Sequence, residues 1–174
     1  MYFKKNRNNY SLISINQMPV SNTSALKEAL TELNGSISEY GLFLTVKQIN
    51  KLSDAVRNAL IESGRIEIGA GIMPILAMEF CASVFVTPEN YAELLAELVY
   101  IFFQVKTAVC DRVSDRDLVR LLKDYYENKA YGNVEIMRDR DIDLLINYIG
   151  LEMGDVIMPS GGAYDSDGYA DERA

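Results

Sequence analysis

The sequence predicts an all-α protein, a compact bundle of five to six helices with a long central helix at about residues 88–112. Apolar residues recur every three or four positions through most of the middle of the chain, which is the spacing of one helix face. Helix start and stop signals separate these stretches. Strand-like alternation is confined to short segments at residues 10–15 and 65–69. Together these observations favour helices packed on helices, with at most a short extended connector at 65–69.

The first helix is expected at about residues 24–40, where leucine, isoleucine and tyrosine recur at helical spacing. Asn34 and Gly35 lie in its middle, so a break at that point is an open alternative. Gly41 follows directly and suits a left-handed cap at the carboxyl end, because glycine carries no Cβ that would oppose such a conformation.

The second helix is expected between Thr45 and Gly64 and has the best-defined ends. Thr45 and Gln48 have the T-x-x-Q spacing of a capping box, in which each side chain accepts a hydrogen bond from the other residue's backbone N–H. Gly64 follows the last residue of the apolar stripe, where a glycine stop signal belongs.

A connector and a short third helix come next. The sequence R-I-E-I at 65–68 alternates charged and apolar residues, as an extended segment does. Gly69 and Gly71 lie so close together that unusual backbone torsions are expected there. The third helix is expected at about 72–83 with Pro74 in its first turn, and it is apolar on most sides, which predicts a central position.

The central helix is expected to begin at Pro88, after Thr87, and to end at Asp111 or Val113. A cap, a proline and an acidic residue in succession are a strong start signal. Its apolar arc is too broad for a single neighbour, so several helices should pack against it. The fifth helix is expected to begin after Ser114 and to end before Gly132.

The sixth helix is expected at about 134–149, with a start near Asp139 as the alternative. The whole helical domain would then cover residues 21–149. Residues 1–20 carry a net charge of +3 and form an expected flexible arm, whose segment 10–15 has the pattern of a short strand without an evident partner. Residues 150–174 carry a net charge of −5 and several glycines, which is typical of a disordered acidic tail.

The composition excludes several classes of function. The net charge of −8 disfavours a nucleic-acid partner and anionic membranes, which both attract basic proteins. No apolar run approaches the length of a membrane span. The chain has no histidine, so histidine-dependent catalysis is excluded, and its two cysteines cannot form a zinc site of the usual kind. We therefore expect a cytoplasmic protein without a cofactor or a metal.

Lys106 is the most unexpected residue, because it falls inside the apolar arc of the central helix. A buried lysine needs a carboxylate partner or loses its proton. One interpretation is a binding or catalytic ammonium in a pocket with Arg65 and Glu67. The other, which we favour, is a structural ion pair or a side chain that reaches solvent from the edge of the arc. Arg57, at the margin of the second helix stripe, is a weaker case of the same kind.

Short motifs spread over residues 33–149 resemble a known family. They are Y-G-L-F-L-T at 40–45, Arg57, G-R-I-E-I-G at 64–69, F-C-A-S at 80–83, N-Y at 90–91, E-L at 97–98, I-F-F at 101–103, Lys106 and S-D at 114–115. The family they resemble is an uncharacterised group of small bacterial proteins, known only as a domain of unknown function. The resemblance implies a bacterial, cytoplasmic setting and assigns no activity, substrate or catalytic residue.

Two hypotheses about function follow. The first, which we prefer, is a protein-binding or adaptor domain without catalytic activity, whose partner is another protein or a second copy of the chain. It rests on the lack of catalytic motifs and on aromatic-rich helical surfaces. The second is a small-molecule-binding protein or enzyme that uses Arg65, Glu67 and Lys106, and it requires a concave pocket in which these side chains converge.

Overall fold

The computed structural model describes residues 22–138, 142–152 and 154. The predicted arm at 1–20 and nearly all of the predicted tail lie outside these ranges. Over the described residues the fold is all-α, as predicted, with no strand and no helix that is long and apolar enough to cross a membrane. The helices are α1 (Thr23–Ile37), the 3-10 helix η2 (Ser38–Tyr40), α2 (Val46–Ser63), α3 (Met73–Phe80), α4 (Tyr91–Ala108), α5 (Asp115–Asn128), the 3-10 helix η3 (Val134–Met137) and α6 (Ile142–Glu152).

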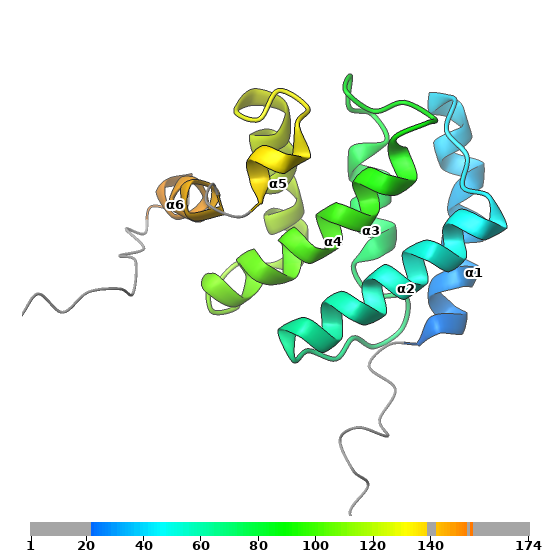
Figure 1. The fold of residues 1–174 in the computed structure, drawn as a ribbon, viewed down its shortest axis with the longest axis horizontal. Coiled ribbons are helices and arrows are strands. Elements are labelled where there is room, and N and C mark those ends of the chain that lie inside the picture. Colours follow the sequence, from blue (N-terminus) through cyan, green and yellow to red (C-terminus); the bar gives the residue numbers. More distant parts are fainter. Residues whose placement is uncertain (1–21, 139–141, 153, 155–174) are drawn as a thin grey trace, which may run out of the picture.

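Helices α2 and α4 run side by side in the same direction (Figure 1). Polar pairs join them at both ends. Near their starts, Lys51 Nζ lies 3.5 Å from Glu93 Oε1, and just beyond their ends Arg65 contacts Asp111. Two neighbouring helices can be parallel only if the chain returns between them, and the connector and α3 make this return.

Helix α1 is continuous through Asn34 and Gly35, so the alternative of a break there is wrong. From within the helix, the Asn34 side chain contacts the loop that follows. Its Oδ1 accepts a hydrogen bond of 2.7 Å from the Leu44 N–H, and its Nδ2 donates one of 2.9 Å to the Leu44 carbonyl. Asn34 therefore anchors this loop. Gly41 ends η2 in the left-handed conformation, as predicted, with φ of 73°.

The predicted ends of α2 are confirmed. Thr45 and Gln48 form the reciprocal capping box, and Gly64 caps the other end with φ of 66°. The start of α5 also follows the prediction, since Ser114 Oγ accepts a hydrogen bond of 3.2 Å from the Asp117 N–H. These signals are reliable because each involves hydrogen bonds between residues only three or four positions apart.

Helix α4 is central, as predicted, but shorter at both ends than residues 88–112. At its start, Thr87 and Asn90 each accept a hydrogen bond from the other's backbone N–H and form a turn before the helix. At its end, Cys110 and Asp111 both have positive φ, of 52° and 58°, which reverses the chain. Non-glycine residues rarely adopt this conformation, and the sequence carries no sign of it. Helix α3 is also shorter than the predicted 72–83, ending at Phe80.

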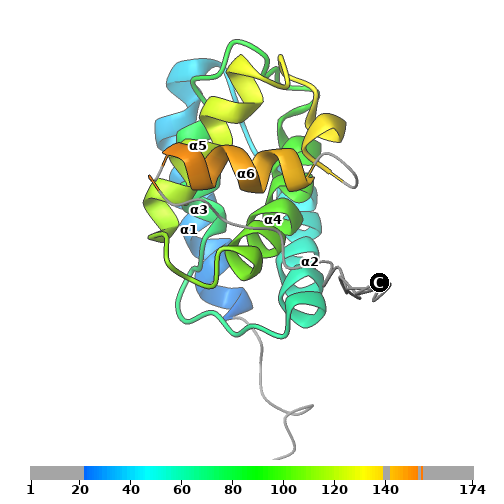
Figure 2. The ribbon, with the colours of Figure 1, turned by 90° about the vertical axis from the view of Figure 1, so that its left-hand side faces the viewer.

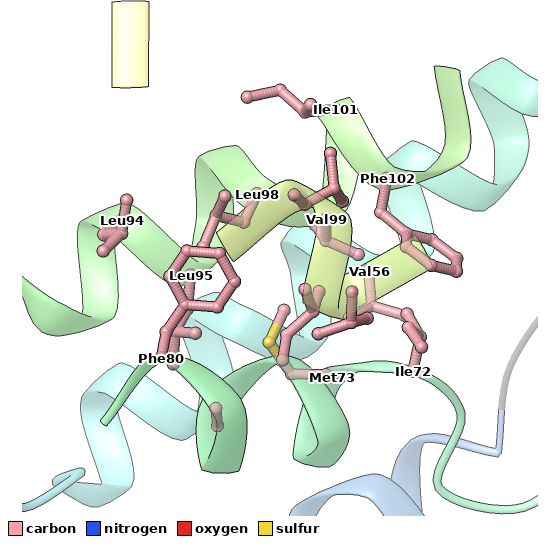
Figure 3. Close-up of a cluster of buried hydrophobic side chains, with 14 of the residues drawn as sticks. Val56, Ile72, Met73, Phe80, Leu94, Leu95, Leu98, Val99, Ile101 and Phe102 are labelled. Atoms are coloured by element: carbon pink, nitrogen blue, oxygen red, sulfur yellow. The ribbon is translucent and has the colours of Figure 1, made fainter. Parts of the chain in front are cut away.

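The core lies between α4 and the helices that surround it. Figure 3 shows Leu95, Val99 and Phe102 of α4 above Met73 and Phe80 of α3. These side chains are at most 1% exposed. Tyr91 is equally buried, and its hydroxyl donates a hydrogen bond of 2.7 Å to the Ala77 carbonyl, so the polar end of the ring has a partner.

Helix α6 crosses over α4 and α5 on one face of the molecule (Figure 2). It begins at Ile142, which is closer to the alternative start near Asp139 than to the start at 134, because 134–137 form the separate 3-10 helix η3. It also continues to Glu152, beyond the predicted end at 149. Its position on α4 leaves a space between α6 and α2.

Candidate functional site

Three of the four residues singled out from the sequence meet at the end of α4. Arg65, Glu67 and Lys106 line one pocket of about 400 Å³. The small-molecule hypothesis required these three side chains to meet in one pocket. The other lining residues are Ile66, Phe102, Phe103, Asp111 and Asp115. Arg57 is exposed on α2 and does not line this pocket.

Lys106 is 9% exposed and its ammonium group lies near three oxygen atoms. Its Nζ lies 2.7 Å from Asp115 Oδ1 and 3.8 Å from Asp111 Oδ1, and it donates a hydrogen bond of 2.5 Å to the Val113 carbonyl. These contacts join the end of α4, the following loop and the start of α5. Two of the three ammonium protons therefore have an acceptor within hydrogen-bond distance, and Asp111 adds a longer-range ionic contact.

Arg65 forms a bidentate pair with Asp111. Its two terminal nitrogens donate hydrogen bonds of 2.8 and 3.0 Å to the two carboxylate oxygens, and its Nε donates one of 3.3 Å to Thr107 Oγ1. The guanidinium holds the pKa of the Asp111 carboxyl below its ordinary value, and the carboxylate raises the pKa of Arg65. This fork geometry fixes the orientation of both groups.

Glu67 is the half-buried carboxyl group of the pocket. Its Oε1 accepts a hydrogen bond of 2.9 Å from the Ile72 N–H just before α3. It makes no ion pair with any residue that the structure describes. Gly71 leaves room for it, since a Cβ there would lie 2.0 Å from Glu67 Oε2. Burial raises the pKa of Glu67, partly opposed by the Ile72 N–H, and Asp115 raises it further.

Replacing Glu67 with glutamine is expected to change how stability depends on pH. The pKa of Glu67 is higher in the folded protein than its ordinary value of 4.5, so the folded state binds this proton more tightly. Wild-type stability therefore falls, relative to Glu67→Gln, as pH rises from that value through the folded pKa. Urea unfolding of both proteins between about pH 4 and pH 8 measures the difference.

Glu28→Gln, which removes an exposed carboxylate from α1, is the matched control for the loss of one negative charge. A difference between Glu67→Gln and the wild type that stays constant over the whole pH range would contradict the expected role of burial.

The sequence interpretation missed the acidic partners Asp111 and Asp115. The expected central helix continued as far as Asp111 or Val113, so Asp111 was expected to be helical. Because α4 ends at Ala108 and the chain reverses at Cys110 and Asp111, that carboxylate returns to the side of Lys106. Asp115 lies in the first turn of α5, where the helix dipole also favours a negative charge. The only indication of these partners in the sequence was that a buried lysine needs an acidic residue nearby.

A second and larger hollow lies along α4 on the side where α2 and α6 face each other. Both helices pack against α4 and not closely against each other. We call the resulting space the trough, and its volume is about 610 Å³. Its lining residues are Ala59, Glu62, Ser63, Tyr100, Phe103, Gln104, Thr107, Ile142 and Ile146.

The trough continues into a smaller polar hollow of about 280 Å³. Glu62, Tyr100 and Gln104 line both spaces, so the two are continuous. At the polar end, Arg138 pairs with Glu97 at 2.5 Å. Glu62 is exposed on the rim and pairs with no described residue. The trough therefore has an apolar centre and a rim with one unpaired negative charge.

Neither hollow has the ligands of a metal site. Among the described residues, no three histidine, cysteine, aspartate or glutamate side chains are placed so that they could hold a metal ion. The acids of the pocket are directed at Lys106, at Arg65 and at the backbone before α3.

Comparison with known proteins identifies one family. A family model described as "Family of unknown function (DUF6323)" matches residues 29–154, well over half of the chain. Neither the curated proteins nor the solved structures yield a match. The matched range includes every residue of the pocket and of the trough.

Proposed function

Because the chain belongs to the DUF6323 family, whose function is unknown, we propose from the geometry that it is a protein-binding domain that receives an amphipathic segment of a partner protein in the trough. The observation that carries this proposal is the trough itself, a hollow of about 610 Å³ lined by both apolar and polar side chains of α2, α4 and α6. Helical segments commonly bind in such grooves, with apolar residues at helical spacing directed at the floor.

The lining of the trough suits this kind of partner. Tyr100 and Phe103 of α4 and Ile142 and Ile146 of α6 supply apolar surface on two sides. Gln104 adds hydrogen-bonding capacity in the middle of the floor. Aromatic and aliphatic anchors surrounded by a polar rim are characteristic of protein interfaces.

Charge specifies the partner further. Glu62 on the rim forms no ion pair with a described residue, and the cation nearest along the same hollow, Arg138, already pairs with Glu97. A lysine or arginine beside the apolar residues of the bound segment would pair with it. The domain as a whole is acidic, which also favours a basic partner through long-range attraction. The proposed ligand is therefore a basic amphipathic segment.

Selection of random displayed peptides against the full chain tests this proposal. We expect enriched peptides to carry apolar residues at helical spacing together with lysine or arginine. Synthetic copies should bind the wild type and lose at least about tenfold in affinity toward Ile146→Asp and Glu62→Lys. Fluorescence anisotropy of the labelled peptides provides the measurement.

Leu144→Asp and Glu28→Lys are the matched controls. Leu144 is 59% exposed on the same helix as Ile146 but does not line the trough, and Glu28 is exposed on α1. Both should bind the peptides as the wild type does. Failure to enrich any peptide, or equal binding to Ile146→Asp and Leu144→Asp, would exclude the trough as a binding site.

A second candidate function rests on the convergence of Arg65, Glu67 and Lys106 in one pocket. Two cations and three carboxylates line it, and both cations already have carboxylate partners. A small amine that pairs with Glu67 is therefore a better match than an anion. Calorimetric titration with putrescine tests this candidate, because binding should occur with the wild type and disappear in Glu67→Gln. If neither protein gave a heat of binding with putrescine, this second candidate function would be excluded.

A further inference from the structure

In the connector between α2 and α3, the apolar side chains are more exposed than the charged ones. Exposure alternates along it as in an extended segment: Arg65 and Glu67 are half-buried, whereas Ile66 and Ile68 are exposed, although Ile66 also borders the pocket. Ile66 is 57% exposed and Ile68 is 94% exposed. In an ordinary surface segment the charged residues face water and the isoleucines face the protein. The outer face of this connector is therefore built for a contact.

The backbone in the middle of the connector also lacks hydrogen-bond partners within the described part of the chain. No backbone N–H or C=O of Ile66, Glu67 or Ile68 forms a hydrogen bond with another residue of the described chain. The flanking residues do form them, because the Arg65 N–H bonds to the Leu60 carbonyl and the Ile72 N–H bonds to Glu67. An extended segment with free backbone groups and β-branched side chains can pair with a further strand.

We propose that this edge is paired by residues 10–15 of the same chain, forming a short two-stranded ribbon. That segment reads Y-S-L-I-S-I. In a strand, Ile13 and Ile15 would lie on one face at the same spacing as Ile66 and Ile68. Cross-strand pairs of β-branched residues stabilise such a ribbon, and each pair would shield the other from water. The proposal is independent of the trough and its ligand.

The position at which the described chain begins supports residues 10–15 as the paired strand. Figures 1 and 2 both show the start of α1 beside the connector. The residues from Asn16 to Asn22 lie between the two segments and span up to about 24 Å when extended. The segment can therefore reach the connector of its own chain. The net charge of +3 on residues 1–20 also favours contact with the acidic domain.

Hydrogen exchange at the backbone amides of Ile66, Glu67 and Ile68 in the full chain tests the ribbon. The disrupting variant carries Leu12→Pro and Ile13→Pro together. Neighbouring residues of a strand direct their N–H groups to opposite edges, so one of the two prolines must fall on the paired edge. We expect exchange of at least one connector amide to be about tenfold or more faster in this variant than in the wild type.

The control variant carries Asn8→Pro and Asn9→Pro, which lie outside the pairing segment and should keep the protection. Protection should also be unchanged by tenfold dilution. Rapid exchange in the wild type, or protection that survives the Leu12/Ile13 prolines, would overturn the proposal. An equal loss of amide protection in the two proline variants would also overturn the proposal. Protection that decreases on dilution would also overturn it, because the paired strand would then come from a second copy.

Discussion

Replacing Lys106 with methionine is expected to lower the free energy of unfolding by about 2–3 kcal/mol. Methionine fills much of the space of the lysine stem but donates no hydrogen bond. The Val113 carbonyl would lose its donor, and Asp111 and Asp115 would lose a shared cation. Both acids are about half exposed, which keeps the effect below that of a fully buried pair. Urea unfolding followed by circular dichroism measures it.

Lys51→Met is the matched control, because it removes the same charge from an exposed pair. The Lys51 and Glu93 side chains are 64% and 75% exposed, so the loss should stay below about 0.5 kcal/mol. Equal stability of Lys106→Met and the wild type would show that this lysine does not hold α4 to α5. Its three contacts would then require another explanation, and the second candidate function would gain weight.

Replacing Gly132 with alanine is expected to destabilise the protein by about 2–4 kcal/mol. Gly132 has φ of 80°, which costs an alanine free energy by itself. A Cβ there would also lie 2.4 Å from Cγ of Phe85. That ring packs edge-on against Tyr126, at 6.1 Å between centroids, so it cannot move without disturbing the core. Thermal unfolding measures the loss, and near-ultraviolet circular dichroism reports on Tyr126.

Gly35→Ala serves as the control with the opposite expected sign. Gly35 lies inside α1, and a Cβ there would meet nothing within 4 Å. Alanine should stabilise the helix by about 0.5–1 kcal/mol, because it is a better helix former than glycine. If both substitutions changed stability equally, the close contact between Gly132 and Phe85 would not be the cause.

The order and type of the helices could be predicted from the sequence because the signals are local. Thr45 with Gln48, Ser114 with Asp117, and Gly64 each act through hydrogen bonds or torsions within a few residues. The bounds of α4 were less predictable. Its end depends on two non-glycine residues with positive φ, Cys110 and Asp111, and no residue pattern announces such a turn.

The candidate site was predictable in part. An apolar arc containing Lys106 indicated a buried ammonium group, and the structure places it beside Arg65 and Glu67. The partners Asp111 and Asp115 were not identified, because their positions depend on where α4 stops. The trough was not expected at all. Its walls come from α2, α4 and α6, which are distant in sequence, and the crossing of α6 over α4 creates it.

The sequence by itself determined the helical class, the caps of α2 and α5, and the position of Lys106 on an apolar helix face, since periodicity and capping are properties of one segment. Only the tertiary structure decided what Lys106 contacts, that the connector directs its isoleucines outward, and that a trough lies between α2 and α6. Each of these depends on how separate helices pack, and a side chain acquires its partners only when packing brings distant segments together.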